Sequence, residues 1–600
     1  FRSSDRSNIL PGVLSARIWL KQRYAQCEDL LARYAEPLAA WAHLLRTPNG
    51  GSPERTAEDR RLLQHAWKLL LQNGPHDSVT GCSVDAVYDD VSLRFQKCEQ
   101  IGEAVYFEAL REIAEAAAPS GEACAVAWNP LNVSRTDFCT VRVPVREGEE
   151  PTHAVDESGV AAPLQPVERG LNSPVDRRER VVFGFVANEV PALGYKVFRL
   201  ERRETAAAMP PVGATAIENE FFRVTGEADG TLTVEDKRHG RVLRGLNRFL
   251  DVGDRGDEYT YDPPPDDRVV DRPSGAVDVA VTEAGPARWT LEVRQAYSLP
   301  ARWTLEVRQA YSLPARLTPD RRGRSEDCVE CEITSRVRLY PGVARVDVET
   351  EVDNRAEDHR LRVLFPAGVA TDHSDAEQHF GVVRRPVDCP PEAANAPESP
   401  VAYYPQKTFT DLSDGEHGLM IANRGLAEYE VMSDGSAGTE DDGTATLAVT
   451  LLRCVGWLSR DDLSMRRGHA GPGFETPGAQ MPGRWTFEYS LIPHAGGWRE
   501  AFSEAHAFAR PLRSLRTSRG SGRLPREKSL LTVDVPELVV STVKLAEDDD
   551  SVVARAYNIA GEAHGRVSAV DLNEENAANV DASRLVLRPN EIVTLKFPHP

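Results

Sequence analysis

Residues 72–82 (QNGPHDSVTGC) contain two side chains whose types and spacing could do chemistry, His76 and Asp77. They lie between two strongly helical runs. Gly74 and Pro75, directly before them, must end the first helix, so we expect a loop here. A neutral imidazole is a good zinc ligand, and a carboxylate can accept hydrogen bonds from two hydroxyl groups, such as those of a sugar. The other interpretation is a His-Asp pair that only caps a loop.

Two further clusters of potential metal ligands carry weaker signals. Cys328 and Cys331 form a lone CxxC without a second pair, inside an alternating pattern typical of a strand. His373, Asp375 and His379 lie in a polar segment that we expect to form a surface turn. We therefore interpret both clusters as ordinary structural positions. The sequence contains no Gly-rich phosphate loop, nucleophile elbow or HExxH motif.

Charge and composition argue against several classes of function. The formal net charge is −21, whereas binding to nucleic acid or to an anionic membrane surface requires a basic face. No apolar run approaches the roughly 20 residues of a membrane-spanning helix. Nine scattered cysteines, an odd number, are typical of a reduced, cytoplasmic protein. The chain begins at Phe1 with neither Met nor a signal sequence, so we expect a piece of a longer protein.

Hydrophobic periodicity predicts helices in the first part of the chain. A length of 600 residues implies about three to five domains. Apolar residues recur at threes and fours over residues 14–45, 62–70 and 84–105, with Gly/Pro-containing breaks between these runs. Residues 1–120 are therefore predicted to form a three-helix bundle that ends near Pro119.

Beyond the bundle the hydrophobic period changes to two, as in β-strands. Short alternating runs predict a small β domain over residues 121–205, a large β-sandwich over 216–512 and a C-terminal β-sandwich over 529–600. Segments 204–215 and 513–528 have the composition of linkers. The predicted fold class is α+β multidomain, with an N-terminal three-helix bundle followed by predominantly antiparallel β-sandwich domains.

A perfect duplication interrupts the large β region. The sequence ARWTLEVRQAYSLP occurs at residues 287–300 and again, unchanged, at 301–314. Repeat architectures show at least three diverged copies, so this pair indicates a recent duplication or an assembly error. Only one copy can occupy the original place in the sheet. We expect the other copy to form an added edge strand or a bulged loop.

Sequence blocks in a fixed order along nearly the whole chain resemble a known family. In the helical part they are ILPGVLSARIWLK (9–21), AEPL (35–38), and AWKLLLQN followed by PHDSVTG (66–81). In the β part they are GDEYTYDPP (256–264), DHRLRVLFP (358–366), GLAEYE (425–430), VGWLSR (455–460) and TPGAQ (476–480). Together these blocks resemble the bacterial branch of glycoside hydrolase family 38, the zinc-dependent α-mannosidases. The resemblance implies that the large β region is a mutarotase-like supersandwich.

The resemblance implies roles for three residues. His76 matches the His that completes the family's zinc site, and Asp77 matches the carboxylate that holds sugar hydroxyls beside the metal. Tyr259 lies in a segment similar to the one that lends a Tyr to the sugar pocket; the alternative for Tyr259 is an ordinary strand aromatic. Neighbouring polar residues are expected to have structural roles, as solvated turn residues (Asp257, Glu258, Asp262) or in loops near the pocket (Arg460, Arg466, Gln480).

The same resemblance implies that the family's other zinc ligands, Asp nucleophile and general acid belong to an N-terminal α/β barrel. Nothing in residues 1–600 resembles that barrel. We therefore expect the central and C-terminal part of a retaining α-mannosidase that acts on mannose-containing carbohydrates. By itself this part is expected to be inactive. Enzymes of the family often self-associate, and the sequence leaves open whether this protein is a homo-oligomer. The alternative is a non-catalytic carbohydrate-binding or remnant fragment that has lost its barrel.

Overall fold

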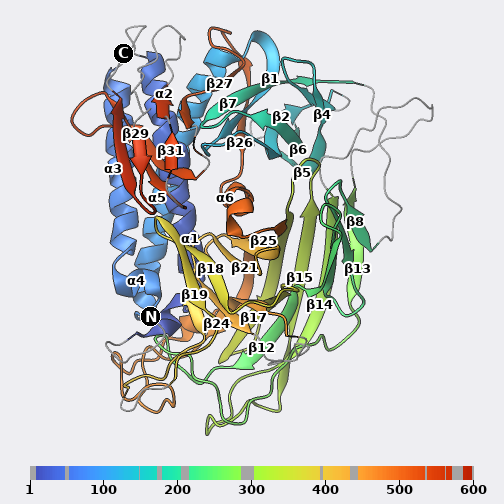
Figure 1. Ribbon diagram of the computed structural model, residues 1–600. Coiled ribbons are helices and arrows are strands. Elements are labelled where there is room, and N and C mark those ends of the chain that lie inside the picture. Colours follow the sequence, from blue (N-terminus) through green and yellow to red (C-terminus); the bar gives the residue numbers. More distant parts are fainter. Residues whose placement is uncertain are drawn as a thin grey trace.

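The computed structural model describes most of the chain in several connected parts. Helices lie along one side, with strands of the C-terminal region packed against them, and large antiparallel sheets form the opposite side (Figure 1). The described residues are 9–46, 53–146, 149–171, 179–203, 215–284, 303–391, 396–432, 443–533, 535, 537–560, 563–565, 567–569 and 585–597.

Three long helical rods form the predicted bundle. The first contains α1 (Trp19–Asp29), a π-helical turn (Leu30–Ala35) and α2 (Glu36–Arg46) without a break. The second is α3 (Pro53–Asn73) and the third is α5 (Asp85–Ala117), with the short α4 (His76–Thr80) between them. Apolar residues at helical spacing, among them Leu31, Leu38, Leu70 and Val105, meet in one core. No helix in the described ranges is long and apolar enough to cross a membrane.

A small sandwich follows the bundle. Its first sheet has, in order, β26 (Arg513–Arg519), β1 (Ser120–Asn129), β7 (Gly194–Glu201), β3 (His153–Val155) and β4 (Ala161–Pro163), and β27 (Glu527–Ser529) also pairs with β7. Its second sheet has β2 (Arg135–Val145), β6 (Glu179–Val190) and β5 (Gln165–Leu171). The prediction of a linker over 513–528 is therefore wrong at both ends. Arg513 pairs with Trp128 on β1, and Lys528 pairs with Tyr195 on β7, because these polar segments complete a sheet edge.

The large β region contains three antiparallel sheets around one core. The longest has β13 (Asp278–Ala284), β14 (Trp303–Pro314), β15 (Cys328–Leu339), β16 (Val346–Asn354), β25 (Gly483–Ala495), β22 (His417–Asn423), β21 (Phe409–Ser413), β18 (His373–Gln378) and β19 (Gly381–Pro386). The second has β12 (Arg248–Gly253), β17 (His359–Pro366), β24 (Thr446–Cys454), β23 (Glu428–Met432) and β20 (Tyr403–Pro405). The third has β11 (Arg241–Leu246), β10 (Leu232–Asp236), β9 (Phe222–Gly226) and β8 (Ala216–Glu218). The helical N-terminus followed by mostly antiparallel sheets confirms the predicted fold class.

The C-terminal region packs on the bundle. Helix α6 (Phe502–Ala509) leads from the large sheets toward it, and the remaining strands are β28 (Leu531–Val533), β29 (Leu538–Leu545), β30 (Val552–Asn558), β31 (Ala563–Gly565), β32 (Val567–Ala569), β33 (Leu585–Leu587) and β34 (Ile592–Phe597). Leu538 and Val540 share a core with Leu38 and Trp41 of α2. Bundle, small sandwich and C-terminal strands are thus held together by common apolar burial.

Three local predictions have specific outcomes. Residues 303–314 of the duplication form β14, which lies between β13 and β15, while the copy at 287–300 lies outside the described residues. Cys328 and Cys331 occupy strand β15, as expected, with Cys331 buried. The surface turn predicted around His373 is wrong: residues 373–378 form β18, whose central residues are buried.

Candidate functional site

His76 and Asp77 form an exposed corner at the lower end of the bundle (Figure 1). They begin the short helix α4, so the predicted loop contains one helical turn that starts directly after Pro75. The side chains are 90% and 53% exposed, and the His76 Nε2 atom lies 3.3 Å from the Asp77 Oδ1 atom. The corner therefore presents one imidazole and one carboxylate to a ligand that approaches from outside this part of the chain.

The backbone around this corner is held by contacts on its inner side. Gly81 ends α4 with φ of +88°, and a Cβ atom at this position would lie 2.7 Å from the Ala16 carbonyl oxygen. The Lys21 ammonium donates to the carbonyl oxygens of Ala16 (2.5 Å) and Thr80 (2.7 Å). Burial lowers the pKa of Lys21 to about 7. A left-handed Gly and a desolvated Lys thus fix the turn that carries His76 and Asp77.

Tyr259, from the large β region, contacts the same turn. It is 9% exposed and packs in a small apolar cluster with Cys82 and Leu458. The Gly12 backbone N–H donates to the Tyr259 carbonyl oxygen at 2.9 Å. Burial, and then the nearby Cys82 and Asp77, raise the pKa of Tyr259, which keeps its hydroxyl protonated. The structure therefore brings Tyr259 beside the turn of His76 and Asp77, although 182 residues separate Asp77 from Tyr259 in the sequence.

The acidic residues around Tyr259 are buried, which corrects the prediction that they are solvated. Asp257, Glu258 and Asp262 each show no solvent exposure. Each accepts a charged hydrogen bond from an Arg: Asp257 from Arg466 at 2.5 Å, Glu258 from Arg17 at 2.9 Å and Asp262 from Arg255 at 2.7 Å. Pairing of this kind is what makes buried carboxylates tolerable. Burial raises the pKa of Glu258 to about 8, although Arg17 favours its ionised form.

Arg17 connects the bundle to this acidic segment. Its guanidinium donates to Glu258 and, at 2.5 Å, to Asp85 at the start of α5, and it stacks over the Tyr88 ring at 4.1 Å. The Asp85 Oδ2 atom also accepts the backbone N–H of Gly478 at 2.9 Å. Four segments that are far apart in sequence, at Arg17, Asp85, Glu258 and Gly478, are thus joined behind the corner. Local sequence does not predict these partners, because Asp85 and Glu258 lie 68 and 241 positions away from Arg17.

Arg460, Arg466 and Gln480 have structural contacts. Arg466 is buried against Asp257, and the Arg460 backbone N–H donates to the same carboxylate at 2.7 Å. The Gln480 side chain exchanges two hydrogen bonds with Asp358. Arg460 and Arg466 thus support the Tyr259 segment, whereas Gln480 holds the residue before β17. All three contacts are structural, as expected.

The described residues do not complete a metal centre. No group of three His, Cys, Asp or Glu side chains within the described ranges is placed to hold a metal ion. His76 offers one exposed imidazole, whereas a zinc site in a protein needs at least three protein ligands. The described part of the chain thus brings one exposed imidazole and one half-exposed carboxylate together at this corner.

Comparison with known proteins assigns most of the chain to domains of one family. Residues 9–113 match the α-mannosidase middle domain. Residues 217–462 match the glycosyl hydrolases family 38 C-terminal domain, and residues 537–595 match the C-terminal β-sandwich domain of the same family. These three segments together make up more than half of the chain, and they occur in one order.

Individual relatives agree with this assignment. The chain is 28% identical to a protein of Halalkalibacterium halodurans named "Putative mannosylglycerate hydrolase", over 99% of this chain and 68% of that protein. Two crystal structures from Enterococcus faecalis are similar over 98% of this chain. One is an α-mannosidase (TM-score 0.78, 28% identity, 68% of that chain covered), and the other is a family 38 glycosyl hydrolase (0.79, 27%, 71%). The chain belongs to glycosyl hydrolase family 38, a family of glycosidases.

Proposed function

We propose that residues 1–600 are the middle and C-terminal part of a zinc-dependent, retaining α-mannosidase that removes terminal α-mannosyl residues from oligosaccharides or small mannosides. The observation that carries the proposal is the meeting of Tyr259 with the turn of His76 and Asp77. A Tyr from a β domain, a His and a carboxylate from a bundle corner form one wall of a pocket that another part of the protein would close. The exposure of the His76 and Asp77 side chains suits such an arrangement.

His76 fits the role of one zinc ligand. Its imidazole is exposed and is contacted by a carboxylate, Asp77, which can orient the ring and fix its tautomer. When bound, zinc would hold neighbouring hydroxyls of the sugar. The remaining ligands, the nucleophile and the general acid would come from residues outside this chain, as the family resemblance implies. This chain's own contribution is to bind and orient the sugar.

Asp77 and Tyr259 are proposed to hold sugar hydroxyls. The Asp77 carboxylate is half exposed and can accept two hydroxyl hydrogen bonds. Burial keeps the Tyr259 hydroxyl protonated, so it can donate one. The buried ion pairs behind these residues hold the wall in position before the substrate binds, which lowers the ordering cost of binding.

The test uses the enzyme expressed from its native gene and assayed with an aryl α-mannoside. His76→Ala should lower kcat/KM by about 100-fold or more, Asp77→Asn by a similar factor and Tyr259→Phe by about tenfold. His65→Ala is the matched control, because His65 is an exposed His on α3 away from the corner. Equal activity of the His76→Ala and His65→Ala enzymes would overturn the proposal.

Substrate choice and setting form the finer part of the proposal. A panel of α-1,2-, α-1,3- and α-1,6-mannobiose and mannosylglycerate is appropriate, since one relative is named for mannosylglycerate. Nine scattered cysteines, an odd number, are consistent with a reducing, cytoplasmic compartment. If the native gene product hydrolyses none of these mannosides yet binds mannobiose, the protein is the non-catalytic carbohydrate-binding alternative.

A further inference from the structure

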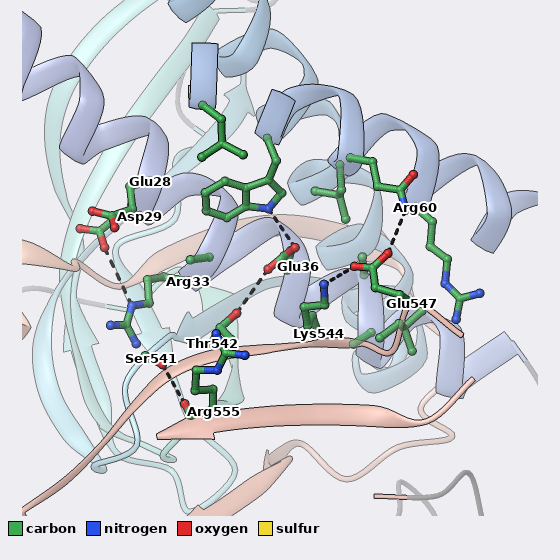
Figure 2. Close-up of a pocket in the computed structure, with 18 of the residues that line it drawn as sticks. Glu28, Asp29, Arg33, Glu36, Arg60, Ser541, Thr542, Lys544, Glu547 and Arg555 are labelled. Carbon is green, nitrogen blue, oxygen red and sulfur yellow. Dashed lines mark hydrogen bonds and ion pairs between the residues drawn. The ribbon is translucent and has the colours of Figure 1, made fainter. Parts of the chain in front are cut away.

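A cavity of about 500 Å³ lies between the bundle and the C-terminal strands. Neither His76, Asp77 nor Tyr259 lines it, so it is separate from the corner described above. Figure 2 shows Glu28, Asp29, Arg33 and Glu36 of the bundle near Thr542, Lys544 and Arg555 of the C-terminal strands, with a hydrogen bond from Thr542 to Glu36 at 3.3 Å. Its volume lies in the range of small-molecule sites. The cavity therefore has room for a ligand between two parts of the protein.

One wall of the cavity is apolar and fixed in orientation. Leu63, Trp67 and Leu71 follow each other at intervals of four along one face of α3, and all three line the cavity. The Trp67 indole N–H donates to the Glu36 carboxylate at 2.9 Å, which holds the ring in place. Leu71 is 61% exposed, so its side chain is open to a ligand. An immobilised aromatic ring with flanking aliphatic groups suits the C–H face of a sugar ring.

A second part of the lining contains a buried carboxylate and a buried guanidinium. Glu377 and Arg510, 2% and 5% exposed, both line the cavity. The Glu377 Oε1 atom is occupied by His506 at 2.8 Å, and the Arg510 Nε atom donates to Asp29 at 3.1 Å. The Glu377 Oε2 and Arg510 Nη1 atoms have no hydrogen-bond partner among the described residues. Buried polar atoms of this kind normally have a partner, and a hydroxyl group can donate to the carboxylate and accept from the guanidinium.

The charges around the cavity favour a neutral ligand. Six carboxyl side chains and seven Lys or Arg side chains line it, so neither sign predominates. Several of these charges are already paired, such as Lys407 with Glu28 at 3.1 Å. An anion would meet as many like charges as opposite ones. A ligand without net charge but rich in hydroxyls meets both donors and acceptors at no such cost.

We propose that this cavity binds a neutral oligosaccharide, with a sugar ring stacked on Trp67 and Leu71 and its hydroxyls bonded to Glu377 and Arg510. The ligand would bridge helix α3 of the bundle and the buried residues at β18 and at the end of α6. The site does not depend on the proposed mannosidase function, because no residue is shared between the two.

Isothermal titration calorimetry of the 600-residue chain with α-1,2-mannobiose, maltose and cellobiose tests the site. At least one of these disaccharides should bind with a Kd of about 1 mM or tighter. Leu71→Asp should weaken this binding at least tenfold without unfolding the protein, because Leu71 is exposed. Leu93→Asp is the matched control, since Leu93 is 47% exposed and does not line the cavity. Trp67→Ala should also abolish binding, while Trp67→Phe should retain part of it.

Two further measurements distinguish the cavity from the corner and from an anion site. His76→Ala should leave disaccharide binding unchanged; loss of binding in that variant would move the ligand to the corner and overturn the cavity proposal. Inorganic phosphate should not bind, and saturable phosphate binding that is lost in Leu71→Asp would show an anion site instead. Absence of binding by all three disaccharides at about 10 mM would equally overturn the proposal. None of these results depends on whether the native gene product hydrolyses mannosides.

Discussion

Asp257 and Arg466 form a buried ion pair across 209 residues of sequence, with 2.5 Å between Asp257 Oδ2 and Arg466 Nη2. The other Asp257 oxygen accepts the backbone N–H groups of Tyr259 and Thr260, each at 3.0 Å. One carboxylate thus shapes the turn that carries Tyr259 and is itself neutralised by a distant loop. The pair explains how an acidic segment can be buried and how Tyr259 is held at the corner.

Breaking this pair should destabilise the protein strongly. Asp257→Asn leaves the Arg466 guanidinium buried without a compensating charge, and we expect a loss of about 3–5 kcal/mol in the free energy of unfolding. Urea unfolding followed by circular dichroism measures it. The exposed pair of Arg484 and Glu351 provides the comparison: Arg484→Gln should cost less than about 1 kcal/mol. If both variants lose a similarly small amount of unfolding free energy, the buried pair of Asp257 and Arg466 contributes no more to stability than an exposed pair does.

Gly81→Ala tests the close approach that fixes the His76 turn. Gly159 has nearly the same φ, +87° against +88°, but a Cβ atom there meets nothing within 4 Å. Gly159→Ala should therefore cost about 1 kcal/mol, for the left-handed conformation alone. Gly81→Ala should cost about 2 kcal/mol more, because its Cβ atom contacts the Ala16 carbonyl oxygen. If thermal unfolding shows equal losses of stability in the two variants, the backbone near Ala16 shifts to accommodate the added Cβ atom at position 81.

Lys21 should make stability depend on pH on the alkaline side. Its pKa is about 7 in the folded protein and about 10.5 when unfolded, so the unfolded state binds more protons between these values. Stability should therefore rise with pH from 7 to 10, by on the order of 2 kcal/mol from this group. Lys21→Met should remove that rise, whereas Lys97→Met, at an exposed position of α5, should retain it. A Lys21→Met protein with the wild-type pH profile would contradict the assignment.

Zinc should not stabilise the 600-residue chain. A ligand that binds only the folded state raises the melting temperature. Zinc sites need at least three protein ligands, and the described residues offer no group of three, with or without the proposed ligand His76. Differential scanning fluorimetry should give the same Tm in micromolar zinc and in EDTA. A saturable increase in Tm that disappears in His76→Ala would show that further ligands exist within this chain.

Much of the fold and of the corner could be predicted from local sequence. Apolar spacing of three and four predicts the three helical rods, and the change to a period of two predicts the β region, because each element must bury one face. The family blocks selected His76, Asp77 and Tyr259. The structure packs Tyr259 against Cys82, next to the turn that carries the other two, while the chemical roles of all three stay predictions.

Only the tertiary structure decided which charges are buried and which segments pair. Asp257, Glu258 and Asp262 look solvated in sequence, since their partners Arg466, Arg17 and Arg255 include residues more than 200 positions away. Residues 513–519 have the composition of a linker because a polar edge strand has no hydrophobic run, yet β1 supplies their hydrogen bonds. The physical reason is common to both cases. Hydrophobic periodicity predicts which face of a segment is buried. Whether a charge is buried, or whether a segment pairs at a sheet edge, depends on residues that are distant in the sequence.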